Sequence, residues 1–376
     1  MTTRTLSLIA LLTLLLTPSL APACTIVSAV AKNGDVWNMN NEDGPTMVAN
    51  FINVFPKTEH TRYGYYTLSY VSSKAGEGAN AQGGMNEAGL TFDFNAIRHI
   101  DAFDPASRQA FPEGNDAILA HIMGNMRTVD EVIAFFETYW FEGGFQSAQM
   151  HVADRDGKFA LISPSGVYVA EAGQPLISTN FDICGGEDGG DCWRYPIAEE
   201  KLATREVGLA TMLSIALDTR QKQYTTVYSN VQNLTTGDIW FMSYHDAGRL
   251  ASVNIADLLG RGRQSYSFRD LASVEEGEPK SDRALQQIAG SELPVDSLIG
   301  TYQNPYVGNI TVASHPSGVK VTYANGAEDV LVAQSDGVYA WSEGDEVVTF
   351  AREGGSGDWL LHLYVEGWWA VSSRRE

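Results

Sequence analysis

Residues 21–30, with the sequence APACTIVSAV, place a cysteine between small residues and a β-branched, apolar run. Upstream, Arg4 gives a basic start and residues 6–16 (LSLIALLTLLL) form an apolar region. Together with the small residues before the cysteine, this is typical of a secretory signal peptide cleaved after Ala23. Cleavage there makes Cys24 the first residue of the mature chain, so that one residue carries both a thiol and a free α-amine.

The other two cysteines, Cys184 and Cys192, are consistent with an exported protein. The apolar run is too short to span a bilayer, and no later segment is long and apolar enough to do so, so we expect no transmembrane helix. The predicted location is periplasmic or extracellular. Cys184 and Cys192 are eight residues apart, and in an oxidising compartment this spacing predicts a disulfide loop. Cys24 is then left as the odd thiol.

Composition excludes several classes of function. The formal net charge of −21 argues against nucleic acid or anionic lipid as a partner. The seven histidines show no paired spacing, which argues against a zinc site. The chain has no phosphate-binding loop, dinucleotide fingerprint or G-x-S-x-G elbow, so we expect no cofactor, no metal and no serine-triad chemistry.

The pattern along the chain predicts an α+β domain followed by a small all-β domain. Asn33-Gly34 joins two apolar runs in a hairpin, and residues 83–96 form a second hairpin-like unit. We expect helices from near Asn115, capped by that residue, from Thr128, whose TVDE forms a capping box, and over about 197–217. Further strands are expected at 149–153, 158–162, 226–234 and 239–244.

Beyond these elements the pattern changes. An acidic linker is expected over 273–293, and after it only short strand and turn signals occur, which predict a small antiparallel barrel or sandwich. The predicted division is a signal peptide over 1–23, the α+β domain over 24–272, the linker over 273–293 and the β domain over 294–376. A homo-oligomer is compatible with the sequence, which does not fix the oligomeric state.

An N-terminal cysteine can act without a histidine. Its α-amine titrates near ~7.7–8.0 and its thiol near ~8.5, so proton transfer between them costs about 1 kcal/mol. The amine can take the thiol proton, and the thiolate can attack a carbonyl to form an acyl-enzyme. Such a site needs an anion for the ammonium, donors for the oxyanion and a group that orders them.

The residues that meet these needs resemble a known family. Cys24-Thr25, the hairpin after it and Asn41-Glu42-Asp43 resemble the N-terminal-nucleophile amide hydrolases, in particular the choloylglycine hydrolase and penicillin V acylase group and the acyl-coenzyme A:6-aminopenicillanic acid acyltransferase group. The segments 84–90 (GMNEAGL), 179–182 (TNFD) and 192–195 (CWRY) agree with that pattern, and the resemblance covers roughly residues 24–270.

The resemblance implies a four-layer αββα sandwich and a role for each of five residues. Cys24 would be nucleophile and base, and Asp43 the carboxylate that holds its amine and thiol. Asn180 would donate its side-chain amide to the oxyanion, Asn95 would donate its backbone N–H, and Arg194 would order the site. The implied function is hydrolysis of the linear amide bond of a small N-acyl substrate through a Cys24 thioester.

One departure bears on the substrate. Many relatives have arginine three residues before the aspartate, where this chain has Asn40, and this weakens any assignment to bile salts. Two alternatives stay open. The same thioester could pass its acyl group to an amine, which is acyl transfer. Cys24 could instead be the lipid-modified anchor of an exported lipoprotein, although a lipobox favours leucine where this chain has Ala21.

Overall fold

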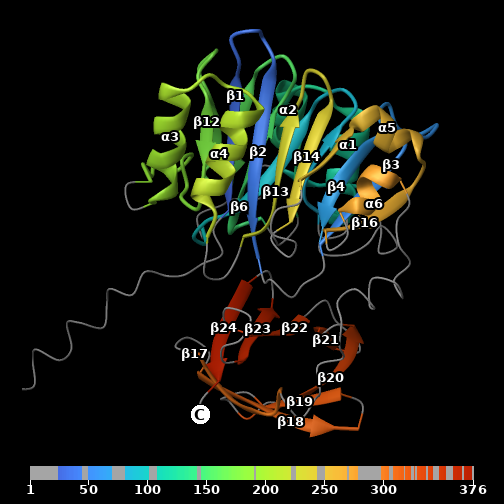
Figure 1. Ribbon diagram of the computed structural model, residues 1–376, viewed down its shortest axis with the longest axis vertical. Helices are drawn as coiled ribbons and strands as arrows, with labels where there is room; N and C mark the ends of the chain where they lie inside the picture. Colours follow the sequence, from blue (N-terminus) through green and yellow to red (C-terminus); the bar gives the residue numbers. More distant parts are fainter. Residues whose placement is uncertain are drawn as a thin grey trace, which may run out of the picture.

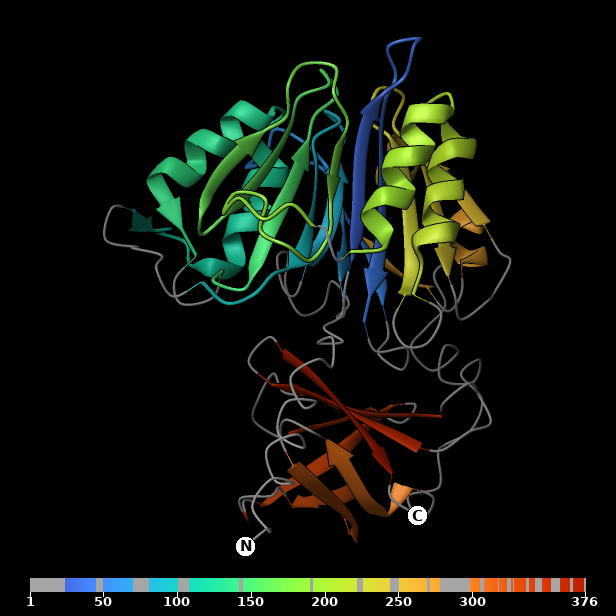
Figure 2. The same ribbon diagram turned by 90° about the vertical axis from the view of Figure 1, so that its left-hand side faces the viewer.

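The computed structural model of the chain is drawn in Figures 1 and 2. The residues that it describes are 24–44, 50–69, 81–100, 108–141, 145–189, 192–221, 226–243, 250–268, 271–277, 298–304, 308–316, 318–322, 326, 328–335, 338–341, 347–352, 359–365 and 368–374. The predicted signal peptide and most of the predicted linker lie outside them.

Two antiparallel sheets make up the larger part of the fold. The first has six strands in the order β12-β1-β2-β13-β14-β15. Its strands are β1 (Thr25–Val30), β2 (Val36–Asp43), β12 (Leu176–Ser178), β13 (Thr226–Asn233), β14 (Asp238–Ser243) and β15 (Leu250–Asn254). The hairpin β1–β2, at the start of the described chain, therefore lies inside this sheet and not at its edge (Figure 1).

The second sheet has eight strands in the order β11-β10-β9-β6-β5-β4-β3-β16. Its strands are β3 (Phe51–Phe55), β4 (Tyr65–Ser69), β5 (Ala81–Asn86), β6 (Thr91–Ala96), β9 (Ala148–Ala153), β10 (Phe159–Ser163), β11 (Gly166–Val169) and β16 (Gln264–Ser267). A short parallel pair, β7 (Gln109–Ala110) and β8 (Tyr139–Trp140), stands apart from both sheets.

The two sheets face each other, and helices cover their outer faces (Figure 2). The helices on the outer faces are α1 (Asn115–Asn125), α2 (Val129–Thr138), α3 (Arg194–Thr204) and α4 (Leu209–Thr219). Two shorter helices, α5 (Ile255–Gly260) and α6 (Ala272–Glu276), instead contribute Leu258 and Val274 to the apolar cluster between the sheets. Apolar residues of α1 and α2 pack with the second sheet, and those of α3 and α4 pack with the first. A third apolar cluster, which includes Tyr66, Phe241 and Phe268, joins the two sheets.

Strand β2 explains how a polar site can lie in this interior. All eight of its residues are buried, and they alternate between two faces. Trp37 and Met39 pack toward α3 and α4, whereas Val36 joins the cluster between the sheets. Asn38, Asn40 and Glu42 continue the face of Val36. The space between the sheets is therefore apolar at one end of β2 and polar along the rest.

Most helices and hairpins agree with their sequence patterns, including the Thr128 capping box. One cap differs from the prediction. The residue before α1 is Gly114, with φ of 87°, and Asn115 is the first helical residue, without a side-chain cap. The predicted cap was therefore wrong by one residue, because Gly114 adopts the left-handed backbone that leads into the helix.

Eight further strands follow, drawn in orange and red in Figure 1. They are β17 (Gly300–Asn304), β18 (Gly308–His315), β19 (Gly318–Thr322), β20 (Glu328–Ser335), β21 (Val338–Trp341), β22 (Val347–Arg352), β23 (Trp359–Val365) and β24 (Trp368–Arg374). Each pairs antiparallel with the next, and β17 also pairs with β24, so the strands close into a barrel.

Candidate active site around Cys24

The β1–β2 hairpin decides what faces Cys24. The register pairs Thr25 with Asn41 and Ile26 with Asn40. Cys24, one residue before β1, is therefore opposite Glu42. Opposed residues of an antiparallel pair point to the same face, so the thiol and the Glu42 carboxylate meet between the two sheets.

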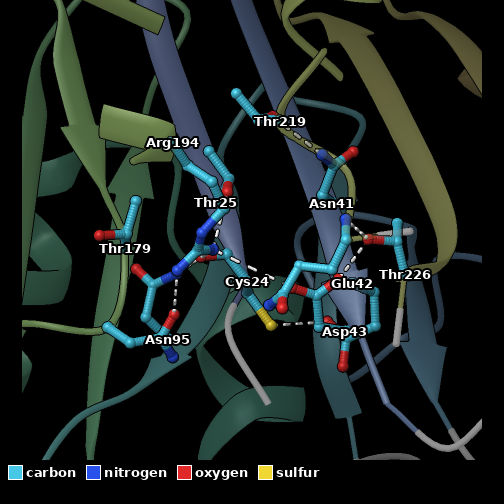
Figure 3. Close-up of polar contacts among 12 residues, drawn as sticks. Cys24, Thr25, Asn41, Glu42, Asp43, Asn95, Thr179, Arg194, Thr219 and Thr226 are labelled. Carbon is cyan, nitrogen blue, oxygen red and sulfur yellow. Dashed lines mark hydrogen bonds and ion pairs between the residues drawn. The ribbon is translucent and has the colours of Figure 1, made fainter. Parts of the chain in front are cut away.

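Cys24 is fixed at both its sulfur and its carbonyl (Figure 3). The residue is buried, with 7% of its surface exposed. Its thiol donates to Glu42 Oε2 at 3.6 Å. Its carbonyl oxygen accepts from Arg194 Nη1 at 2.7 Å and from Asn95 Nδ2 at 3.3 Å. The first residue of the predicted mature chain is thus held from β2, β6 and α3 together.

Arg194 is the hub of these contacts. It is the first residue of α3 and is buried. Besides the Cys24 carbonyl, Nη1 donates to Thr25 Oγ1 at 2.9 Å, and Nη2 donates to Asn180 Oδ1 at 3.0 Å. Nη1 also lies 4.0 Å from Asp43 Oδ2. The planar guanidinium thus connects four segments of the chain, which fits the ordering role that the resemblance implies.

Asp43 lies on the other face of β2 from Glu42. Its Oδ1 accepts from Thr226 Oγ1, and its Oδ2 accepts from Gln221 Nε2 at 2.8 Å. Asn41, on the same face, donates to Ala216 O at the end of α4 and so ties that helix to β2. The structure therefore places the Asp43 carboxylate among Thr226 of β13, Gln221 beyond the end of α4, and Arg194.

The two predicted asparagines flank Cys24 and Arg194. Asn180, which follows β12, donates its amide to the Ala96 carbonyl at 2.7 Å, while its oxygen accepts from Arg194. Asn95 is fully buried in β6, and its side chain contacts the Cys24 carbonyl. All five predicted residues are thus brought together, and the side chain of Asn95 provides a contact that the sequence did not indicate.

Glu42 is the residue that sequence analysis missed. It is 2% exposed and contacts the sulfur directly. Across the sheets, Asp93 of β6 is equally buried. Burial raises the pKa of Asp93 well above its ordinary value, and the Glu42 charge raises it further, while the Phe94 N–H and the Asn40 amide act to lower it. The signal available in the sequence was the run of four polar residues, 40–43 (NNED), inside a strand.

Charges around the sulfur favour the neutral thiol. Burial raises the pKa of Cys24 well above its ordinary value, and the charges of Glu42, Asp43 and Asp93 add to the effect. The Asp43 backbone N–H acts in the opposite direction. A positive group at the same place, such as the α-ammonium of a mature Cys24, is favoured by the same carboxylates.

The predicted disulfide is wrong for this structure, in which Cys184 and Cys192 are free thiols. The Cys184 thiol donates to Leu161 O at 3.6 Å, whereas Cys192 Sγ accepts from Thr179 Oγ1 at 3.2 Å. Burial raises the pKa of Cys192, but the Arg194 charge and the Thr179 hydroxyl outweigh it, and the pKa is lowered. Each sulfur therefore has its own partners.

Two kinds of feature are absent from the described residues. No group of three or more His, Cys, Asp or Glu side chains among them is placed to hold a metal ion. No helix in that part of the chain has the length and apolar character needed to cross a membrane.

Comparison with known proteins gives structural likeness only. No family model and no curated protein matches the chain. Similar solved structures include a variant of conjugated bile acid hydrolase from Clostridium perfringens, with a TM-score of 0.44, 12% identity, and coverage of 65% of this chain and 96% of that one. Penicillin V acylase from Agrobacterium tumefaciens has a TM-score of 0.44, 15% identity, and coverage of 62% and 87%.

A third structure is the N-acylethanolamine-hydrolyzing acid amidase ortholog of Caenorhabditis elegans, with a TM-score of 0.40, 19% identity, and coverage of 56% of this chain and 93% of that one. The three are members of the N-terminal-nucleophile hydrolase superfamily, which the sequence motifs also resemble. At such low identity, function has to be argued from the side chains around Cys24.

Proposed function

We propose that this chain is an exported cysteine amide hydrolase of the N-terminal-nucleophile type. Removal of residues 1–23 frees the α-amine of Cys24, whose sulfur attacks the carbonyl of a linear N-acyl amide. The observation that carries the proposal is the anchoring of Cys24 by Arg194 and Asn95, with Asn180 and Asp43 bonded to or beside the same guanidinium. These residues come from separate segments and have the chemistry that such a nucleophile needs.

The chemistry balances with one sulfur, one amine and one base that accepts the thiol proton. The thiol gives its proton to that base, a C–S bond forms, and the carbonyl electron pair moves to oxygen. Asn180 and the Asn95 backbone N–H, in the roles that the resemblance implies, stabilise that oxyanion. The oxyanion then collapses, the C–N bond breaks, and the leaving amine takes a proton from the α-ammonium. Water, activated by the α-amine, hydrolyses the thioester, and the released thiolate takes its proton back from the base.

The proposal includes the architecture. We assign the two sheets and their outer helices to the four-layer αββα arrangement, with residues 24–272 as the hydrolase domain and 294–376 as a separate β domain. Its support is that α1 and α2 pack on one sheet, α3 and α4 on the other, and an apolar cluster lies between the sheets.

The burial of the sulfur argues against a lipid anchor. A diacylglycerol on Cys24 would need the sulfur at the surface, but the residue is 7% exposed and its thiol faces Glu42 between the sheets. Acylation of the amine would also remove the group that protonates the leaving amine. We therefore favour the enzyme over the anchored lipoprotein.

The test uses protein that starts at Cys24 and a panel of N-acyl amides. We expect turnover, with an acyl-enzyme detected as a mass increase on Cys24. Cys24→Ala should abolish both. A matched protein that keeps Ala23 retains the thiol but has no free amine on Cys24, and it should be inactive. Normal turnover by the Cys24→Ala variant would refute the proposal. Products formed with an added amine would separate hydrolysis from acyl transfer.

A further inference from the structure

Glu42 has the contact expected of a proton acceptor for the nucleophile. Its Oε2 accepts the Cys24 thiol at 3.6 Å, and both residues are buried. The contact does not depend on a flexible loop, because Glu42 lies in a strand buried on both faces and is fixed opposite Cys24 by the hairpin register. A carboxylate held in this way is available each time the sulfur gains or loses a proton.

The charges around Cys24 make the α-amine a poorer acceptor. The charged groups that act on the sulfur are Glu42 and Asp43 from β2 and Asp93 from β6, with Arg194 from α3 on the carbonyl side. The raised pKa of Asp93 favours its neutral form, but the carboxylates of Glu42 and Asp43 still outnumber the single guanidinium and favour the ammonium form of the mature amine. An ammonium can protonate a leaving amine, but it cannot take the thiol proton.

We propose that Glu42 accepts the proton of the Cys24 thiol during the attack and returns it to the sulfur when the thioester is hydrolysed. This inference rests on the proposed amide hydrolysis. The α-ammonium protonates the leaving amine as the C–N bond breaks, and the resulting neutral amine takes a proton from the attacking water. When the C–S bond breaks, the thiolate regains its proton from Glu42. Every group is then back in its starting state, and no co-reactant other than water is needed.

The test compares two rates that this role moves in opposite directions. Glu42→Gln in the mature protein removes the acceptor, so kcat/KM should fall by about 10²-fold or more. The same change removes a negative charge beside the sulfur. Alkylation of Cys24 by iodoacetamide at neutral pH, followed by peptide mass mapping, should therefore become about tenfold faster. Glu42→Met, which also removes the charge at similar volume, should behave in the same way and serves if the glutamine variant does not fold.

Controls lie in the same molecule. Alkylation of Cys184 and Cys192 should keep its wild-type rate, and Glu59→Gln, which changes a side chain that is 85% exposed, should alter neither measurement. If activity and alkylation both rise, or both fall, in the Glu42 variants, the proposed role is wrong. Alkylation needs no substrate, so it tests the Glu42–thiol pair even if the amide panel gives no turnover. If the mature protein hydrolyses amides but the Glu42 variants do not combine a lower kcat/KM with faster alkylation, the proposed function is retained and the proposed role of Glu42 is wrong.

Discussion

Cys24 and Glu42 oppose each other across the β1–β2 hairpin because the turn between the strands has three residues. Gly34 N donates to Ala31 O and Ala31 N donates to Asp35 O, which leaves residues 32–34 as the loop. Gly34 has φ of 89°, as in a type I turn that ends in a left-handed residue. The length of this turn, which ends ten residues after Cys24, therefore determines that Glu42 is the acid that faces the sulfur.

The first prediction concerns Gly34. A Cβ at this position would meet no atom within 4 Å, so Gly34→Ala tests the backbone conformation alone. We expect the free energy of unfolding, measured in urea, to fall by about 1–2 kcal/mol. Gly260→Ala, in α5 and also with open space around it, should be neutral or slightly stabilising. Equal effects of the two substitutions would show that the turn does not require its left-handed residue.

The sequence predicted this hairpin but not the length of its loop. Asn33-Gly34 correctly predicted a hairpin, and the residues that the family pattern selected lie close together around Cys24 and Arg194. A two-residue Asn-Gly loop, however, pairs Lys32 with Asp35 and would place Cys24 opposite Asp43. The actual loop is one residue longer, and a shift of one residue exchanges the faces of Glu42 and Asp43. Composition and spacing cannot fix such a register, because both loops are common for this dipeptide.

The polar layer between the sheets was also beyond prediction. Strand β2 is buried although five of its eight residues are polar, and alternation rules favour apolar residues at such positions. Partners from distant strands compensate for the burial: Asn38 Nδ2 donates to Gln232 Oε1 at 2.9 Å, and Thr91 Oγ1 donates to the same oxygen at 2.8 Å. These hydrogen-bonded side chains are more than 140 residues apart in the chain, so no local sequence pattern predicts that they pair.

The second prediction concerns Arg194→Lys. A single ammonium cannot reach the Cys24 carbonyl, Thr25 and Asn180 together, so the nucleophile should lose its fixed position. We expect kcat/KM to fall about 10²-fold, mainly through kcat, with the fold preserved by circular dichroism. Arg98→Lys, at an ion pair whose arginine is 71% exposed, is the matched control and should keep its activity. Activity near the wild-type level in the Arg194 variant would contradict the ordering role.

The third prediction separates two functions of Asn180. Asn180→Ala removes both the amide donor and the oxygen that Arg194 contacts, and kcat should fall by about 10²–10³. Asn180→Asp keeps an oxygen for Arg194 but has no N–H to offer, so it should be equally impaired if the amide stabilises the oxyanion. Single-turnover kinetics would measure acylation in both. An aspartate variant with wild-type acylation would assign Asn180 to the support of Arg194 alone.

The fourth prediction concerns stability in acid and starts from His151 of β9. Its Nε2 lies 2.9 Å from Ser28 Oγ, and its Nδ1 lies 2.8 Å from Ser178 Oγ. Ser28 uses its own proton on Asn38 Oδ1, so Nε2 must be the donor to Ser28 and Nδ1 the acceptor from Ser178. The neutral imidazole thus satisfies both of its serine partners, Ser28 and Ser178. Burial lowers the pKa of His151 from 6.5 to about 3.

The lowered pKa of His151 determines the direction in which stability changes with pH. Between pH 6.5 and about 3, the unfolded chain binds the His151 proton and the folded chain does not, so stability is lost as the pH falls through this window, at up to ~1.4 kcal/mol per pH unit. His151→Gln should remove this contribution and flatten the acid side of the stability profile, measured by urea unfolding from pH 7 to pH 4. Carboxylates titrate in both proteins and cancel in the difference. His60→Gln, at a side chain that is 84% exposed, should follow the wild type. Parallel profiles for the wild type and the His151 variant would mean that the buried imidazole is not held neutral by the fold.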